Sequence, residues 1–137
     1  MNEQPVLLVE DNPDDELLTV RVLKKSNIHN IVVARDGVEA LDYLFSTENF
    51  AGSGTNPRPS FILLDLKLPR MDGLECLMAI RADERTRGIP VIIITSSKDE
   101  RDVKRSGALR VKGYLNKPLD QQQLAETLNG LGISYQT

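Results

Sequence analysis

The sequence contains little of what several kinds of site require. Its one cysteine, Cys76, cannot form a disulfide within the chain, which suits a reducing cytosol, and its apolar neighbours predict a core position. Its one histidine, His29, has no cysteine or second histidine nearby, so we expect neither a zinc site nor a histidine-based metal hydrolase. No apolar run approaches the roughly 20 residues that cross a membrane, and residues 1–4 lack the basic start of a signal peptide. We therefore expect a cytoplasmic protein with no membrane partner.

The charge balance argues against one further class of partner. Lys and Arg total 17 and Asp and Glu total 20, which gives a formal net charge of −3, whereas nucleic-acid-binding domains are usually clearly basic. We therefore expect no nucleic-acid partner. The 137 residues, 40% of them hydrophobic, fit one domain of ordinary size with a full core. Without a repeat or any sign of a second domain, residues 1–137 are predicted to form a single domain.

Five short apolar runs predict the strands of a sheet. The first four are nearly continuous in Val, Ile and Leu, a pattern typical of parallel strands that are covered on both faces, and the fifth is shorter. The runs are Val6–Val9, Ile31–Ala34, Phe61–Leu64, Val91–Ile94 and Gly113–Leu115.

Helical patterns separate these runs and follow the last one. Asn12 can cap a helix that has Pro13 in its first position and extends to about Lys25. Further helices are predicted near 37–45, after Asp72-Gly73, from near Asp99 and from near Asp120. Their apolar faces are expected to include Leu17, Leu18 and Leu23 in the first helix and Leu74, Leu77, Met78 and Ile80 in the third. Five alternations of strand and helix predict an α/β sandwich with a parallel sheet and right-handed crossovers.

Polar residues stand at the ends of four of the five runs. Because the C-terminal ends of parallel strands share one edge of the sheet, these side chains should meet where α/β sheets bind ligands. They are Glu10-Asp11 after the first run, Asp65 after the third, Thr95-Ser96-Ser97 after the fourth and Asn116-Lys117-Pro118 after the fifth.

Three carboxylates in one place predict a hard cation and phosphoryl chemistry. Like charges at short range disfavour joint ionisation unless a cation offsets them, and oxygen ligands alone favour Mg²⁺ or Mn²⁺. One carboxylate could then act as a nucleophile, with Lys117 and Thr95 contacting phosphoryl oxygens. Each residue also has a plainer interpretation: Asp11 or Asn12 as a helix cap, Thr95 as a strand end, and Lys117 as a solvated charge.

The chain resembles CheY-type receiver domains from about Pro5 to Leu131. The motifs that carry this resemblance are Leu7-Leu8-Val9-Glu10-Asp11-Asn12, Leu63-Leu64-Asp65, Leu68-Pro69 with Met71-Asp72-Gly73, Ile94-Thr95-Ser96, and Tyr114 with Lys117-Pro118. The resemblance implies a three-layer (βα)5 flavodoxin-like fold whose five parallel strands have the order 2-1-3-4-5. It also implies a single-domain response regulator, not itself an enzyme, that receives a phosphoryl group from a sensor histidine kinase.

The resemblance further assigns roles to individual residues. Asp65 would be the phosphoacceptor, and Glu10, Asp11, Asp65 and the backbone carbonyl of Lys67 would hold Mg²⁺, with Mn²⁺ as the other candidate. Lys117 and Thr95 would contact the phosphoryl group, and Thr95 and Tyr114 would form a switch pair. The Lys117-Pro118 peptide bond would be cis.

Partner surfaces are implied in the same way. The kinase would dock on the first helix near Asp14, Leu17 and Leu18, unless Leu17 or Leu18 belongs to the core. The fourth helix, fifth strand and fifth helix would form the output surface and a homodimer contact. A closer similarity to the small regulators of cyanobacterial phytochromes implies a phytochrome-type kinase. The segments that carry this closer similarity are Pro13-Asp14-Asp15, Leu41-Asp42-Tyr43-Leu44, Asp65-Leu66-Lys67-Leu68-Pro69 and Arg81-Ala82-Asp83-Glu84-Arg85-Thr86.

One segment departs from the family pattern, and one loop is unusually long. Arg110 stands where most relatives place a glycine, often with positive φ, and Gly107 stands where a larger residue is usual, so the fourth helix is expected to be short or shifted. The loop from Ser46 to Ser60 is long, and it is either a surface insertion or a partner contact.

Two other functions stay open. A Mg²⁺-dependent aspartyl-phosphate phosphatase would need a second carboxylate where Lys67 stands. A phosphorylation-independent interaction module would have no need of the acidic pair together with Asp65, Thr95 and Lys117.

Overall fold

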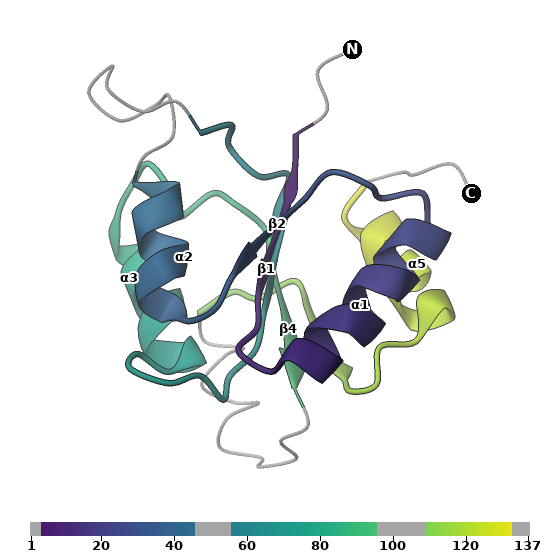
Figure 1. Cartoon of the computed structure of the whole chain (residues 1–137). Coiled ribbons are helices and arrows are strands. Elements are labelled where there is room, and N and C mark those ends of the chain that lie inside the picture. The colour runs from purple at the N-terminus through teal and green to yellow at the C-terminus, as the bar shows by residue number, and fades with distance from the viewer. Residues whose placement is uncertain (1–3, 46–55, 96–108, 133–137) are drawn as a thin grey trace.

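Five parallel strands form the centre of the molecule (Figure 1). The computed structural model describes residues 4–45, 56–95 and 109–132. The strands are β1 (Val6–Val9), β2 (Ile31–Ala34), β3 (Phe61–Leu64), β4 (Val91–Thr95) and β5 (Gly113–Asn116). They lie in the order β2-β1-β3-β4-β5, which confirms the predicted flavodoxin-like sheet. The last two strands each extend one residue further than the apolar pattern predicted.

Helices cover both faces of the sheet. The described helices are α1 (Pro13–Lys25), α2 (Gly37–Leu44), α3 (Gly73–Ala82) and α5 (Gln121–Gly130). In Figure 1, α2 and α3 lie on one side of the sheet and α1 and α5 on the other. None of the described helices is long and apolar enough to cross a membrane. The predicted fourth helix near Asp99 and the residue Gly107 lie outside the described residues.

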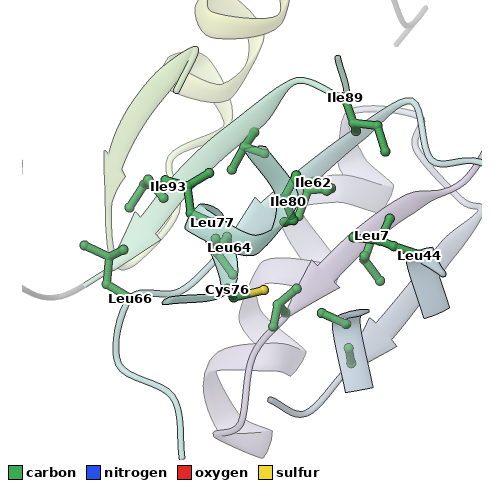
Figure 2. Packing of buried hydrophobic residues seen from close by; sticks show 14 of the residues in the cluster. Leu7, Leu44, Ile62, Leu64, Leu66, Cys76, Leu77, Ile80, Ile89 and Ile93 are labelled. Atoms are coloured by element: carbon green, nitrogen blue, oxygen red, sulfur yellow. The ribbon is translucent and has the colours of Figure 1, made fainter. Parts of the chain in front are cut away.

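The two sheet faces each carry a hydrophobic core, which explains the continuous apolar runs. The core under α2 and α3 includes Leu7, Ile62 and Ile93 from the strands and Cys76 and Leu77 from α3 (Figure 2). Cys76 is fully buried, as predicted, and burial raises the pKa of its thiol to about 12. Alternate residues of the same strands face the second core, formed with α1 and α5.

The helix starts are set by polar residues at the N-cap position. Asn12 accepts hydrogen bonds from the amides of Asp14 and Asp15 at 2.9 and 3.1 Å, and Pro13 occupies the first turn as predicted. Asp72 and Glu75 form a capping box at the start of α3. The plainer interpretation of Asn12 as a helix cap is therefore correct.

Three residues assigned to apolar helix faces are wrongly placed by the sequence pattern. Leu17, Leu18 and Met78 are 53%, 47% and 51% exposed, although each helix packs on the sheet. Thr19, not Leu17 or Leu18, is buried with Leu23 in α1. The helical period alone did not fix the rotation of α1 and α3 about their axes, because apolar residues stand on more than one side of each.

Two of the unusual segments are described in part. Arg110 has φ of 60°, so the positive φ expected at this position is present with arginine in place of glycine. Residues 46–55 of the long loop lie outside the described part, but its end is tied to α2. The Tyr43 hydroxyl donates to the carbonyl of Pro57 at 2.6 Å, and the Asn56 amide group donates to the carbonyl of Tyr43 at 3.2 Å.

Gly73 allows α3 to begin directly beside the end of β3. A Cβ at this position would lie 2.2 Å from the carbonyl oxygen of Asp65 and 2.5 Å from Cα of Leu66. The amide of Gly73 donates to the carbonyl of Leu66 at 3.0 Å, so the close approach is fixed by a hydrogen bond. Any side chain at Gly73 must displace the backbone of Asp65 or the start of α3.

We expect Gly73→Ala to destabilise the protein by about 2–4 kcal/mol, because the added methyl meets backbone and not a flexible side chain. Gly130→Ala is the matched control: nothing lies within 4 Å of its Cβ, and the change should stabilise by about 0.4–1 kcal/mol. Urea unfolding of both variants tests this. Equal effects of the two substitutions would contradict the steric argument.

Candidate functional site

The register of the sheet brings the predicted polar residues to one edge. Val9 pairs with Leu64, so Glu10 and Asp65 follow neighbouring strands at the same level. The amide of Asp65 donates to the carbonyl of Val9 at 3.1 Å, which fixes Asp65 beside the end of β1. On the other side of β3, Thr95 ends β4 and pairs with Asn116 at the end of β5.

Glu10, Asp11 and Asp65 form an acidic cluster. One carboxylate oxygen from each lies within 4.8 Å of the other two, with Glu10 and Asp65 buried and Asp11 exposed. This arrangement agrees with the convergence that the strand ends predicted. Asp11 supplies the open side of the cluster and also lines a pocket of about 410 Å³ with Lys67 and Asp72.

Lys117 lies among carboxylates from three segments. Its ammonium nitrogen lies 2.5 Å from Oε1 of Glu10, 2.6 Å from Oδ2 of Asp65 and 3.0 Å from Oδ2 of Asp15. Burial lowers the pKa of the ammonium, but the three carboxylates, Asp65 first, raise it more, so the pKa of Lys117 lies above its ordinary value. The side chain is only 11% exposed, which excludes the plainer interpretation of Lys117 as a solvated surface charge.

Glu10 is the carboxylate least suited to its environment. Burial, and to a lesser degree the charge of Asp65, raise its pKa from 4.5 to about 7 against the opposing effect of Lys117. Oε2 accepts from the amide of Asn12 at 3.2 Å. Oε1 touches the Lys117 ammonium without the alignment of a hydrogen bond and has no other partner among the described residues.

The cluster therefore fits a divalent cation. An incompletely paired, buried oxygen on Glu10 lies beside two more carboxylates, and every predicted side-chain ligand is an oxygen. The combined charge of Glu10, Asp11 and Asp65 exceeds what the Lys117 ammonium offsets. Oxygen ligands without histidine or cysteine favour Mg²⁺ or Mn²⁺ over zinc.

Asp65 is held in one orientation. Its Oδ1 accepts from the amide of Lys67 at 3.0 Å and its Oδ2 accepts from the Lys117 ammonium at 2.6 Å. The side chain lies at the edge of the sheet and is 3% exposed. A donor on each oxygen therefore fixes the direction of the Asp65 carboxylate.

An ion pair between Arg70 and Asp36, which the sequence did not reveal, ties the loop between β3 and α3 to the start of α2. Asp36 caps α2 by accepting from the amide of Glu39 at 2.9 Å, and it accepts from Nε of Arg70 at 2.7 Å. These amide and guanidinium contacts hold the pKa of Asp36 below its ordinary value. Arg70 has φ of 62°, so a strained residue of the loop is tied to a helix end.

Of the remaining predicted residues, Thr95 and Lys117 lie at this edge and Tyr114 lies two strand positions before it. Thr95 is fully buried, and its carbonyl accepts from the amide of Lys117 at 3.0 Å. Tyr114 pairs with Ile93 and packs against the core under α2 and α3. The Lys117-Pro118 bond is cis. Ser96 and Ser97 lie outside the described residues, and the role of the Lys67 carbonyl stays a prediction.

Asp15 is the site residue that sequence reasoning missed. It lies in the first turn of α1, where acidic residues are already favoured by the helix dipole, so nothing in the sequence pattern marked it as a site residue. Asp14, named for kinase docking, is exposed on the same turn.

Three comparisons with known proteins agree with this geometry. The family described as the response regulator receiver domain matches residues 6–129. Response regulator Rcp1 of Synechocystis sp. is 39% identical over 127 residues, which cover 92% of this chain and 84% of Rcp1. The structure of the bacteriophytochrome response regulator AtBRR has a TM-score of 0.82 and 42% identity, covering 100% of this chain and 98% of AtBRR. The Mn²⁺-bound form of Rcp1 has a TM-score of 0.75 and 34% identity, covering 98% and 100%.

In the absence of divalent cations, we expect stability to fall as the pH rises from about 4.5 to about 7. In this range the folded protein keeps a proton on Glu10 that the unfolded chain has released, so protons favour the folded state. The decrease should be roughly 1–3 kcal/mol.

Urea unfolding in EDTA across this range measures the effect. Glu10→Gln carries no titrating group at this position, so its profile should be flat where the parent protein slopes. A slope that persists in Glu10→Gln would contradict the assignment, and excess Mg²⁺ should stabilise the parent protein most at the alkaline end.

Proposed function

The chain belongs to the response regulator receiver family, and from this premise we propose that it accepts a phosphoryl group on Asp65 in a two-component phosphorelay. The observation that supports this most directly is the environment of Asp65. It lies within an acidic cluster, and one of its oxygens touches a buried lysine at 2.6 Å. We propose that the protein acts as a single receiver domain in the cytoplasm.

The transfer needs a nucleophile and a place for the incoming charge. A carboxylate oxygen of Asp65 forms a bond to phosphorus while the bond between phosphorus and the histidine nitrogen of the donor breaks, and that nitrogen keeps the electron pair. The product is an acyl phosphate, which water later hydrolyses. Lys117 already touches Oδ2 of Asp65 and so contacts the phosphoryl oxygens as they arrive.

Mg²⁺ would be held by Glu10, Asp11, Asp65 and the carbonyl of Lys67, and it would supply charge neutralisation at the phosphoryl oxygens. The chain's own residues position the reaction. The amide of Lys67 and the ammonium of Lys117 orient the Asp65 carboxylate, and Glu10 and Asp15 hold that ammonium in place. The buried position of Asp65 limits the access of bulk water.

Phosphorylation would change the surface through Thr95 and Tyr114. Thr95 lies buried at the end of β4, two strand positions from the Ile93 that pairs with Tyr114. We propose that the Thr95 hydroxyl turns to the phosphoryl group and that the Tyr114 ring fills the vacated space. The phosphoryl group then shifts the population of two states of the output surface.

The proposed donor is a sensor histidine kinase of the phytochrome type. This rests on the similarity to the bacteriophytochrome response regulator AtBRR and to Rcp1. The exposed Leu17 and Leu18 on α1, beside Asp14, offer an apolar docking surface next to the acidic cluster. We also propose that the fourth helix, β5 and α5 form the output surface and the contact of a homodimer.

The phosphatase alternative is less well supported. The residue two positions after Asp65 is Lys67, whose amide donates to Asp65 and whose side chain is no carboxylate. A phosphorylation-independent module would gain nothing from Glu10, which burial penalises when it is ionised. We therefore propose a phosphoacceptor and not a hydrolytic enzyme.

Incubation with acetyl phosphate and Mg²⁺ should add one phosphoryl group, measured by intact-mass spectrometry. Asp65→Asn should abolish the addition, because the amide is not a nucleophile at phosphorus. Asp42→Asn, which alters an exposed carboxylate on α2, should leave it unchanged. Modification that persists in Asp65→Asn would refute the acceptor assignment, and rapid turnover of unrelated phosphate esters would favour the phosphatase.

The docking proposal predicts a loss that depends on the donor. The double substitution Leu17→Ser with Leu18→Ser should slow phosphotransfer from a phytochrome-type kinase by about tenfold or more. Transfer from acetyl phosphate should be unaffected, because both side chains are exposed and neither belongs to the acidic cluster. Met78→Ser is the matched control, since Met78 is 51% exposed on the other side of the sheet. An equal loss with both donors would contradict docking at α1.

A further inference from the structure

A second pocket lies at the opposite edge of the sheet from Asp65. It precedes the first residues of β4 and β5, between the segment that follows α3 and the turn before β5. Arg81, Arg87, Arg110 and Lys112 line it together with Gly88, Ile89 and Pro90, so no acidic residue is among its lining. This concentration of positive charge stands in a chain whose net charge is −3.

Hydrogen bonds from Arg81 hold the two walls of the pocket together. Its Nε donates to the carbonyl of Leu109 at 2.8 Å, and its Nη1 donates to the carbonyls of Arg87 and Ile89 at 2.9 and 3.0 Å. One guanidinium therefore joins both walls of the pocket. Burial and the charge of Arg110 lower the pKa of Arg81, so the pocket gathers like charges that repel each other.

Among the residues that the structure describes, the other three cations of the pocket have no carboxylate partner. No ion pair joins Arg87, Arg110 or Lys112 to any acidic residue within 4–45, 56–95 and 109–132. Asp83 of the same segment is already paired with Arg85. Arg58 adds another guanidinium beside Gly88, because Nη2 lies 3.7 Å from where a Cβ of Gly88 would be.

Arg110 is kept at a backbone conformation that its side chain disfavours. Its φ of 60° lies in the left-handed region, where glycine would be unstrained. Strain of this kind is often associated with function when the surrounding structure holds it in place. Here the Arg110 carbonyl accepts from Nη2 of Arg81 at 3.3 Å, and Arg110 lines the basic pocket with its charge close to Arg81.

We propose that this pocket binds a small multivalent oxyanion of the phosphate class. Guanidinium groups present paired donors that match phosphate oxygens, and Lys112 adds a point charge. The volume of about 170 Å³ holds about five waters at ~30 Å³ each, which suits a phosphate or diphosphate group. The site lies at the other end of the strands from Asp65, so it is separate from the proposed acceptor chemistry and does not depend on it.

The experiment follows amide shifts of the full ¹⁵N-labelled chain during titration with sodium diphosphate, in EDTA and at constant ionic strength. Saturable shifts at Gly88, Arg110 and Lys112 support the proposal. Asp65→Asn should bind diphosphate as the parent protein does, which separates this site from the acceptor. Shifts confined to Glu10, Asp65 and Lys117 would overturn it.

Three variants sharpen the test. Lys112→Gln and Arg110→Gly should each weaken diphosphate binding by about tenfold, and Arg110→Gly should not lower the unfolding temperature, since glycine accepts this φ. Arg21→Gln removes an exposed cation from α1 and should bind normally. Equal weakening in Arg21→Gln would indicate nonspecific charge attraction and overturn the proposal. So would an acidic peptide that binds more tightly than diphosphate, because the occupant would then be a protein segment.

Discussion

The arrangement of carboxylates at the C-terminal edge of the sheet depends on one ammonium group, whose side chain is only 11% exposed. Lys117 contacts Glu10, Asp15 and Asp65, which come from the end of β1, the start of α1 and the end of β3. Without that cation, carboxylates would face each other where burial already penalises their charge. The same cation leaves Glu10 incompletely paired, so the cluster is held together and still favours a further positive charge.

The surrounding fold holds the Asp65 carboxylate in a fixed position within this cluster. Gly73 lets α3 start against the backbone of Asp65, and the amide of Lys67 fixes the Asp65 carboxylate. The loop between them is anchored through Arg70 to Asp36, which is itself held by the first turn of α2. The Asp65 carboxylate is therefore positioned by contacts from several elements.

The two edges of the sheet have opposite electrostatic character. At the C-terminal edge, one lysine is shared by carboxylates, whereas at the N-terminal edge Arg81 is satisfied by backbone carbonyls alone. Carbonyls partner the guanidinium without cancelling its charge, and no described carboxylate pairs with the neighbouring cations. A chain with nearly balanced overall charge thus presents two separate fields, one suited to a divalent cation and one to an anion.

The sequence by itself determined the strands, their parallel arrangement and the residues at their ends, because continuous Val, Ile and Leu runs require cover on both faces. It also placed Glu10, Asp11, Asp65, Thr95 and Lys117 at one edge, since all parallel strands end there. Only the tertiary structure decided the rotation of α1, which exposes Leu17 and Leu18 and turns Asp15 to Lys117. It alone paired Arg70 with Asp36 and gathered the cations around Arg81, because such contacts join residues whose spacing in the chain has no period.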